Sequence, residues 1–305
     1  MMRPKHGFLL GKFLPPHAGH AFLCEFAKAH CEHLTVLVCS INSEPIDGEV
    51  RLRWMRELLP GVRVLHCNED LPQEPADHQN FWAIWRDVMH RYHPEPIDAV
   101  YASEAYGARL AREAGAVFVP VDPGRLAHPV SGTMLRTDPL KHWENLIAPV
   151  RRDCTRVISL HGPESTGKTT LARQLALHYR TSLAPEYGRT YTETFGTECT
   201  PDDLVRIGRG QTAAIEAAKS TARGFVVTDT DAVMTAVWSD MLTGSRDPWF
   251  TTCPVSDYYL VTKTDIGWAD DGTRYFPDDQ LRSEFLDRSI AELETRGLPF
   301  AIVEG

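Results

Sequence analysis

The chain has 305 residues, of which 43% are hydrophobic and 24% charged, values typical of a folded protein long enough for two domains. Its formal net charge of −9 argues against a broad nucleic-acid-binding surface, and no apolar run approaches the ~20 residues that span a membrane. The hydrophobic run within residues 1–10 is too short for a signal peptide, and the seven cysteines form no Cys-x-x-Cys pair. These features predict a reduced, cytoplasmic protein and leave its oligomeric state, including a homo-oligomer, open.

A short apolar strand at 8–10 leads into a loop rich in glycine and proline, residues 11–20, and a helix is predicted over 21–30. The loop carries His17 and His20, whose spacing places both side chains on one face of a first helical turn. Three interpretations are open: a metal-binding pair without a nearby third ligand, two surface histidines without a role, or a phosphate-binding pair. The last is favoured, because a helix N-terminus already attracts anions.

The rest of the first half alternates between strands and helices. Such alternation, with helices of roughly 10–15 residues, predicts a parallel, doubly wound sheet that binds ligands beyond the carboxyl ends of its strands. After it, Ser131 or Thr133 is predicted to cap a short helix, and residues 138–152 to join two domains, 1–150 and 151–305. The strands are predicted at 34–39, 62–66, 97–101 and 116–120, and the helices at 50–59, 81–92 and 104–114.

The second half contains Gly162-Pro163-Glu164-Ser165-Thr166-Gly167-Lys168-Thr169-Thr170, in which two glycines bracket four residues before Lys and Thr. It follows an apolar run at 157–160 and precedes a helical pattern at 171–179, the context of a phosphate-binding loop. In such a loop Lys168 reaches the β- and γ-phosphates and the Thr169 hydroxyl binds Mg²⁺, whereas the alternative is a glycine loop that only caps a helix. A nucleoside triphosphate is therefore predicted to contact Lys168 together with Gly162, Glu164, Ser165, Thr166, Gly167, Thr169 and Thr170.

The run 225–231 is an apolar strand that ends in two carboxylates, Asp229 and Asp231. A buried strand ending in Asp holds Mg²⁺, or its water, in phosphate-loop enzymes, whereas a helix cap is the alternative for Asp231. Residues 263–276 include Asp-Asp-Gly, which by itself is an ordinary turn. The remaining elements are predicted as strands at 258–261 and 300–303 and a long amphipathic helix at 202–222.

Two separated motifs of the first half together form a family signature. Gly-Lys-Phe-x-Pro-Pro-His-x-Gly-His at 11–20 and Ser-x-Thr-x-x-Arg at 131–136 resemble the adenylyl-transferring nucleotidyltransferases with an HxGH motif. Within that superfamily, the first motif is similar to nicotinamide mononucleotide (NMN) adenylyltransferases of the NadR type, in which a phosphate-loop ribosylnicotinamide kinase domain follows. The resemblance covers nearly the whole chain and implies a Rossmann-like first domain and a kinase domain with a parallel sheet. Some NadR proteins begin with a helix-turn-helix domain, for which a catalytic pattern that starts at about residue 7 leaves no room.

For the first half the resemblance implies residue roles around ATP. His17 and His20 would hold the ATP phosphates, and the charges of Lys12 and Arg136 would neutralise the charge that builds on them. The segment 101–107 would lie near a ribose of the nucleotides. Further nucleotide contacts are implied for Gly11, Phe13, Gly19, Ser103, Tyr106, Ser131 and Thr133.

For the pyridine ring of the substrates the resemblance implies aromatic contacts. Trp82 or Trp85 would stack on the nicotinamide of NMN, although tryptophans three apart on a helix are as often core residues. In the kinase half Trp268 and Tyr275 would sandwich the cationic pyridinium of nicotinamide riboside (NR).

The kinase half also resembles its family in a Glu-Tyr-x-Arg element at 186–189 and in a lid region at 268–274. Either Glu186 or Asp229 would accept the proton of the riboside 5′-hydroxyl, and the sequence does not choose between them. Arg274 of the lid would stabilise charge on the transferring phosphoryl group. Further substrate contacts are implied for Tyr187, Asp231, Asp270 and Asp271.

The resemblance implies two reactions of NAD salvage, with ATP as co-substrate and Mg²⁺ as cofactor: NR is phosphorylated to NMN, and NMN is adenylylated to NAD. The chain stops at Gly305 after its last predicted strand, whereas many phosphate-loop kinases continue into a segment that touches adenine. Either this adenine contact is lacking or the chain is shortened, so the resemblance supports the kinase half less fully than the first half. Two alternatives are an adenylyltransferase–kinase fusion of coenzyme A synthesis and a regulator that senses NAD and ATP.

Overall fold

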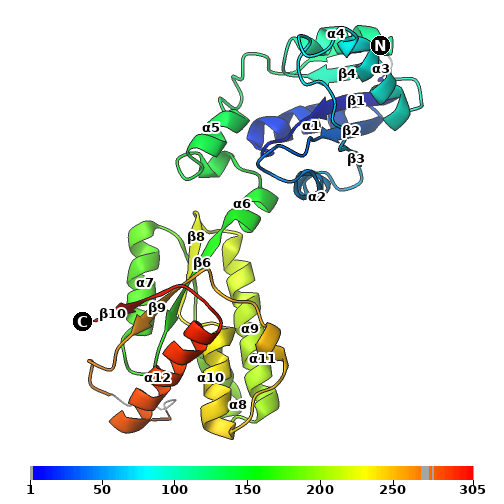
Figure 1. The fold of residues 1–305 in the computed structure, drawn as a ribbon. Coiled ribbons are helices and arrows are strands. Elements are labelled where there is room, and N and C mark those ends of the chain that lie inside the picture. Colours follow the sequence, from blue (N-terminus) through cyan, green and yellow to red (C-terminus); the bar gives the residue numbers. More distant parts are fainter. Residues whose placement is uncertain (1–2, 269–274, 277, 305) are drawn as a thin grey trace. The chain divides into compact units, whose positions relative to one another are not determined.

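The computed structural model describes residues 3–268, 275–276 and 278–304, and the chain divides into two compact units, Met1–Val150 and Arg151–Gly305 (Figure 1). Each unit is built on a five-stranded sheet in which all pairings are parallel, which confirms the predicted α/β class. None of the helices in the described ranges has the length and apolar character of a bilayer-spanning segment. All seven cysteines are free.

The sheet of the first unit has the strand order β3-β2-β1-β4-β5. The order reverses between β1 and β4, and ligands of such sheets bind at this point, beyond the carboxyl ends of the strands. The loop at 12–17 leaves β1 at that edge. The strands are β1 (His6–Gly11), β2 (His33–Cys39), β3 (Arg63–Cys67), β4 (Ala99–Ala102) and β5 (Val117–Pro120).

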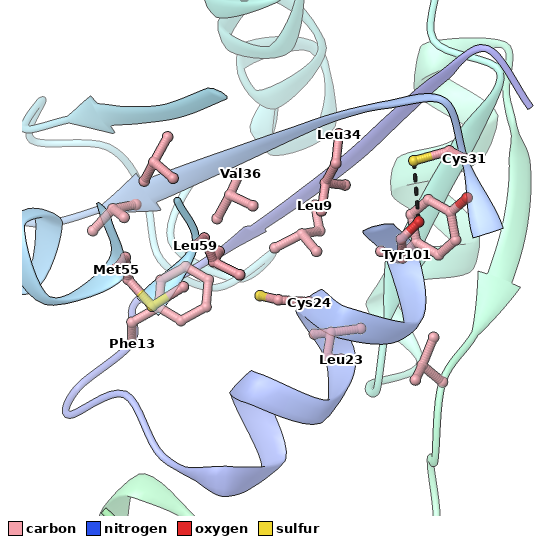
Figure 2. Packing of buried hydrophobic residues seen from close by; sticks show 14 of the residues in the cluster. Leu9, Phe13, Leu23, Cys24, Cys31, Leu34, Val36, Met55, Leu59 and Tyr101 are labelled. Carbon is pink, nitrogen blue, oxygen red and sulfur yellow. Dashed lines mark hydrogen bonds between the residues drawn. The ribbon is translucent and has the colours of Figure 1, made fainter. Parts of the chain in front are cut away.

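Helices cover both faces of this sheet, and successive strand residues point to opposite faces, so both sets of side chains are buried. Leu9 belongs to a core cluster with Cys24 and Met55, from the helices on one face (Figure 2). Its neighbour Phe8 belongs to a second cluster with Met89, from a helix on the other face. The continuous apolar runs of β1 and β2 are therefore those of a sheet covered on both sides.

Six α-helices and a short 3-10 helix accompany this sheet within the described residues. The predicted joint at 138–152 contains helical turns, and its Trp143, Leu146 and Val150 are buried in a cluster with Trp54 of the first unit. The joint is thus a packed end of the first unit. The helices are α1 (Ala18–His30), α2 (Gly48–Leu58), α3 (Phe81–Tyr92), α4 (Tyr106–Ala114), α5 (Gly132–Thr137), the 3-10 helix Trp143–Asn145 and α6 (Ala148–Cys154), which runs past Val150.

The sheet of the second unit has the order β10-β9-β6-β8-β7, so β6 lies at its centre between β8 and β9. A loop that follows the central strand is flanked by the ends of both neighbours, which makes this edge the place for a ligand. The strands are β6 (Arg156–His161), β7 (Ser182–Ala184), β8 (Phe225–Thr228), β9 (Tyr258–Thr262) and β10 (Phe300–Val303).

Three helices of the second unit, α9, α10 and α12, begin at side-chain caps. Thr200 and Asp203 form a capping box with Pro201 as the first helical residue of α9, and Asp278 caps α12 through the N–H of Gln280. Helix α10 is buried almost all round, so it lacks the polar face that marks a surface helix, and it was not predicted. The helices are α7 (Lys168–Tyr179), α8 (Tyr187–Phe195), α9 (Pro201–Lys219), α10 (Ala232–Thr243), α11 (Trp249–Thr252) and α12 (Asp279–Thr295).

Candidate functional site

The first unit places His17 and His20 against each other at the start of α1. The helix begins at Ala18, earlier than predicted, because His17 caps it: its Nδ1 accepts a hydrogen bond from the Gly19 N–H at 3.2 Å. The His20 ring lies over the His17 ring with 3.8 Å between centroids. Phe13, which is 1% exposed, presents its ring edge to His20 at 5.0 Å and so supports the pair from the core.

Both imidazoles are held neutral. Burial, and then the charge of Arg125, lower the pKa of His17 to about 4. Burial, His17 and Arg125 hold the pKa of His20 well below its usual value. Because the Nδ1 of His17 accepts a hydrogen bond, the proton of the neutral ring is assigned to Nε2, which can donate to an anion. The histidines can thus donate hydrogen bonds to phosphate, but the positive charge must come from other residues.

Lys12 and Arg136 are the two residues predicted to supply positive charge, and each already has a partner within the protein. Lys12 forms an ion pair with Glu44 at 3.3 Å, and the buried Arg51 holds Glu44 at 2.6 Å and donates to the Lys12 carbonyl at 2.7 Å. Arg136 donates to the Leu14 carbonyl at 2.5 Å. Both cations are therefore fixed at the loop that follows β1.

The second motif of the first unit sits at the start of α5. Ser131 caps this helix by accepting from the Met134 N–H at 3.3 Å, which confirms the predicted cap, and Thr133 accepts from Arg136 at 3.3 Å. A side chain at Gly132 would lie 2.7 Å from the Leu14 carbonyl oxygen, so glycine allows α5 to approach the first motif closely. The two motifs, far apart in the sequence, thus meet.

They meet around a cavity of about 530 Å³. Sequence reasoning missed the charged residues Asp122 and Arg125 of its wall, because they lie in a loop outside both motifs, whereas Glu104 belongs to the segment 101–107 that was predicted to lie near a ribose. All residues that were predicted for this half line the cavity: Gly11, Lys12, Phe13, His17, Gly19, His20, Trp82, Trp85, Ser103, Tyr106, Ser131, Thr133 and Arg136.

The two tryptophans of this cavity differ in how they are held. Trp85 is 7% exposed, belongs to the second core cluster and donates its indole N–H to the Pro72 carbonyl at 3.1 Å. Trp82 is half-buried, and the Arg109 guanidinium lies 5.5 Å from its ring centroid. Of the two alternatives, Trp82 is the ring available for stacking and Trp85 is a core residue.

In the second unit the loop between β6 and α7 has the backbone of a phosphate-binding loop. Gly162 and Gly167 have φ angles of 120° and 80°, and Ser165 has a φ of 62°, which is rare for a residue with a side chain. A Cβ at Gly162 would lie 2.7 Å from the Thr262 carbonyl oxygen, so the loop packs on the end of β9. Thr166 ties the loop together by donating to the Pro163 carbonyl at 2.8 Å.

A buried arginine from α12 supports this loop and was not predicted. Arg282 is 1% exposed and donates to the Ile266 carbonyl at 3.0 Å and, more weakly, to the Ser165 carbonyl at 3.4 Å. Its ion-pair partner Asp279 lies 2.9 Å away with a side chain that is 89% exposed. The guanidinium therefore supports the carbonyl of the residue with the unusual φ angle.

Next to the loop, Asp229 and Asp231 follow β8 but differ in environment. Asp229 is 3% exposed, and its Oδ1 has no hydrogen-bond partner among the residues that the structure describes. A buried carboxylate oxygen without a partner is costly, and it is suited to bind a cation together with the Thr169 hydroxyl. The described residues contain no cluster of three or more His, Cys, Asp or Glu suited to a metal.

Asp231 does not bind substrate as predicted. Its Oδ1 caps α10 by accepting from the Val233 N–H at 3.0 Å, and its Oδ2 accepts from the Ser256 and Tyr259 hydroxyls at 2.8 Å and 2.7 Å. Both oxygens are therefore taken by the protein core. The helix-cap alternative is the one that the structure supports.

A cavity of about 180 Å³ extends from the loop. Lys168, Thr169 and Thr170 line it on one side, and Glu186 and Arg189, with 3.8 Å between their charged groups, on another. Trp238 of α10 forms an apolar wall that sequence reasoning missed, because it lies in a helix without amphipathic pattern. Other described lining residues include Ser165, Thr166, Gly167 and Tyr275.

Tyr187, which was predicted to bind substrate, is not among the described residues that line this cavity, and its role stays a prediction. Its ring packs on α9, where a Cβ at Gly210 would lie 2.2 Å from the ring. Its N–H donates to Gln211, a fully buried residue of α9 that also donates to the Pro185 carbonyl at 3.2 Å. Gln211 thus holds the loop that carries Glu186, and no motif indicated it.

Glu164 lines the cavity, but its carboxylate binds protein groups. One oxygen accepts from the Phe276 N–H at 2.7 Å and the Trp268 indole at 3.3 Å, and the other from the Tyr275 N–H at 3.0 Å. The residue predicted to contact nucleotide therefore anchors the segment that was predicted to be a lid. Asp270, Asp271 and Arg274 of that prediction lie outside the described residues.

Acid is expected to destabilise both units, because each buries a neutral histidine. The pKa of His161, which is fully buried below the phosphate-binding loop, is lowered to about 3 by burial and by Lys168. Since His17 and His161 have folded pKa values below the usual 6.5, the unfolded chain binds more protons as the pH falls from 6.5 towards 4 and 3. The contribution of each histidine to the free energy of unfolding is therefore fully present above pH 6.5. It is lost as the pH falls below 6.5, by on the order of 3 kcal/mol per histidine.

Unfolding followed by denaturant titration between pH 7 and pH 4 tests this expectation. His161→Leu should flatten the pH dependence of the second unit, whereas His178→Gln, an exposed position on α7, should leave it unchanged. An equal acid sensitivity in His161→Leu and the parent protein would contradict the assignment.

Comparison with known proteins places both cavities in context. A family model for an AAA domain matches residues 157–305. The chain is similar to the trifunctional NAD biosynthesis/regulator protein NadR of Escherichia coli (strain K12), with 27% identity over 326 aligned positions covering 98% of this chain and 78% of the relative. The protein of the same name from Salmonella typhimurium is 26% identical with the same coverage.

Two solved structures are similar over the same range. A crystal structure of NadR in complex with NAD and AMP-PNP aligns with a TM-score of 0.74 and 25% identity, covering 99% of this chain and 91% of that one. A structure of NadR in complex with NR aligns with a TM-score of 0.75 at the same identity and coverage.

Proposed function

This chain is homologous to the NadR proteins, and on that premise we propose that it makes NAD in two ATP-dependent steps. The second unit phosphorylates NR to NMN, and the first unit, as a Rossmann-like nucleotidyltransferase, transfers the adenylyl group of ATP to NMN. The proposal is carried by the convergence of the motif residues on one cavity in the first unit, and of Lys168, Thr169 and Glu186 on one cavity in the second. The NR, NAD and AMP-PNP bound in the NadR structures support the choice of substrates.

In the adenylyl transfer an oxygen of the NMN phosphate attacks the α-phosphorus of ATP, and the enzyme supplies orientation and charge. The Nε2–H of His17 and the start of α1 bind the phosphates of ATP, and Lys12 and Arg136 offset the charge on the leaving pyrophosphate. Trp82 stacks on the nicotinamide ring. No protein nucleophile is required.

In the kinase step the 5′-hydroxyl of NR attacks the γ-phosphorus of ATP. The backbone N–H groups of the loop and Lys168 bind the phosphates, and Thr169 and Asp229 would hold Mg²⁺, which when bound offsets the charge of the β- and γ-phosphates. Glu186, whose side chain is 31% exposed and lines the cavity, accepts the hydroxyl proton. The buried Asp229 is then the metal-binding carboxylate, and its burial favours Glu186 over Asp229 as the base.

Substitution of the two carboxylates is expected to separate these roles. Asp229→Asn should lower NR phosphorylation about 100-fold and raise the Mg²⁺ concentration required for half-maximal rate, because a neutral amide binds the cation weakly. Glu186→Gln should lower kcat by about 10²- to 10⁴-fold without changing that requirement. Initial rates measured against Mg²⁺ concentration distinguish the two, with Asp202→Asn, exposed on α9, as control. A shifted Mg²⁺ requirement in Glu186→Gln alone would reverse the assignment.

The overall function is tested by incubating the protein with NR, ATP and Mg²⁺ and following the products by chromatography. The proposal predicts that NMN appears first and NAD follows. If NR is untouched while added NMN becomes NAD, the second unit is a sensor or acts on another substrate. If neither product forms, the proposal is wrong and phosphopantetheine is the substrate to assay.

A further inference from the structure

The loop between β5 and α5 has a strained and well-defined backbone next to the first cavity. Asp122 and Arg125 have φ angles of 47° and 51°, values that cost residues with a side chain on the order of 1 kcal/mol each. The Asp122 carboxylate accepts from the N–H groups of Leu126 at 2.8 Å and Ala127 at 3.1 Å, and the Asp122 carbonyl accepts from Arg125 at 2.9 Å. Leu126 at the turn is 89% exposed, so polar bonds rather than apolar burial fix the turn.

This turn directs the Arg125 side chain to the cavity. Arg125 lines the wall together with His17 and His128, and its positive charge, after burial, is the next largest contribution to the lowered pKa of His17. It forms an ion pair with Glu104 at 3.3 Å, with side chains that are 47% and 61% exposed. An exposed pair of this kind contributes little free energy, so a ligand phosphate can replace Glu104 at low cost.

The other cations of the cavity are bound more firmly. Lys12 is paired with Glu44, whose side chain is 7% exposed and also paired with the fully buried Arg51. Arg136 is bonded to the Leu14 carbonyl, and the two motif histidines are neutral. Arg125 is therefore the cation of this wall whose present partner is the easiest to exchange.

We propose that Arg125 binds the β- and γ-phosphates of ATP in the first unit and remains on them as they leave as pyrophosphate. The inference rests on the adenylyl transfer proposed above. In that step a bond forms between the NMN phosphate oxygen and the α-phosphorus, and the bond from the α-phosphorus to the bridging oxygen breaks, with its electron pair staying on the pyrophosphate. The negative charge that develops there is offset by a guanidinium that can form two parallel hydrogen bonds.

Steady-state kinetics of NAD formation from NMN and ATP test the proposal. Arg125→Gln should lower kcat/KM for ATP by roughly 10- to 100-fold, with the KM for NMN changed less than about threefold, and should weaken inhibition by pyrophosphate by a similar factor. Arg125→Lys should recover part of the loss, because it keeps the charge but not the planar fork. A kcat/KM for ATP that is unchanged in Arg125→Gln would overturn the proposal, as would a loss confined to the KM for NMN.

One further variant separates ligand binding from the mere loss of an exposed, ion-paired arginine. Arg63→Gln is the matched control, because Arg63 forms an ion pair with Glu95 at 3.2 Å with 44% and 45% exposed side chains outside the cavity. The parent protein is assayed alongside, so an absence of NAD formation in it would count against the proposed function and not against Arg125 alone.

Discussion

Replacing Lys168 with methionine is expected to lower phosphorylation of NR by about 10²- to 10³-fold while the conversion of NMN to NAD continues. Methionine keeps the length of the side chain but removes the charge that would lie on the β- and γ-phosphates. Methionine also removes the hydrogen bond from the Lys168 ammonium to the Pro163 carbonyl, whereas Thr166 still donates to that carbonyl and Arg282 still donates to the Ser165 carbonyl, so the loop should keep its backbone.

Both reactions should be measured on the same preparation, since the chain divides into two compact units after Val150. Arg173→Met, an exposed cation on the same helix, is the matched control. Full kinase activity in Lys168→Met would show that the loop is not the ATP site. Loss of both activities would show that the substitution damages the chain beyond the second unit.

Much of the fold could be predicted because the spacing of hydrophobic residues shows which side of each strand or helix is buried. The apolar runs at 34–39 and 225–228 are strands, with small shifts at their ends, because they are buried on both faces of a sheet. The helix at 81–92 was predicted without error, since its buried residues repeat at helical spacing. By contrast, α10 is buried almost all round and α12 has a weak pattern, so periodicity did not reveal them.

The candidate sites could be predicted where the residue type and its motif indicate that the side chain faces a ligand. The residues of the two motifs of the first half converge on one cavity because Gly132 of the second motif allows close approach to the Leu14 carbonyl of the first. The residue type alone did not predict the roles of Asp231 and Glu164. Their carboxylates accept hydrogen bonds from protein N–H and O–H groups that come from distant parts of the chain. Arg125 and Arg282 were missed for the same reason, because only the folded chain brings Arg125 to the first cavity and Arg282 to the loop between β6 and α7.

The largest effect on adenylyl transfer is expected at His17, which has two separable roles. It caps α1 through Nδ1, and its Nε2–H is available to phosphate. His17→Asn should keep the cap, because an asparagine side-chain oxygen is a good acceptor at this position, but it should not reach the phosphates. His17→Ala should lose both and cost about 1 kcal/mol of stability in addition.

Both variants are therefore expected to form NAD from NMN about 10²- to 10³-fold more slowly, whereas only His17→Ala should unfold at a lower temperature. The measurements are initial rates at pH 7 and thermal unfolding of the same samples. Because burial and Arg125 lower the pKa of His17 to about 4, kcat/KM of the parent protein should show no ionisation of His17 between pH 6 and pH 8. An ionisation in that range that is absent from His17→Asn would mean that His17 acts as a cation. Lys12 and Arg136 would then supply a smaller share of the positive charge that stabilises the leaving pyrophosphate.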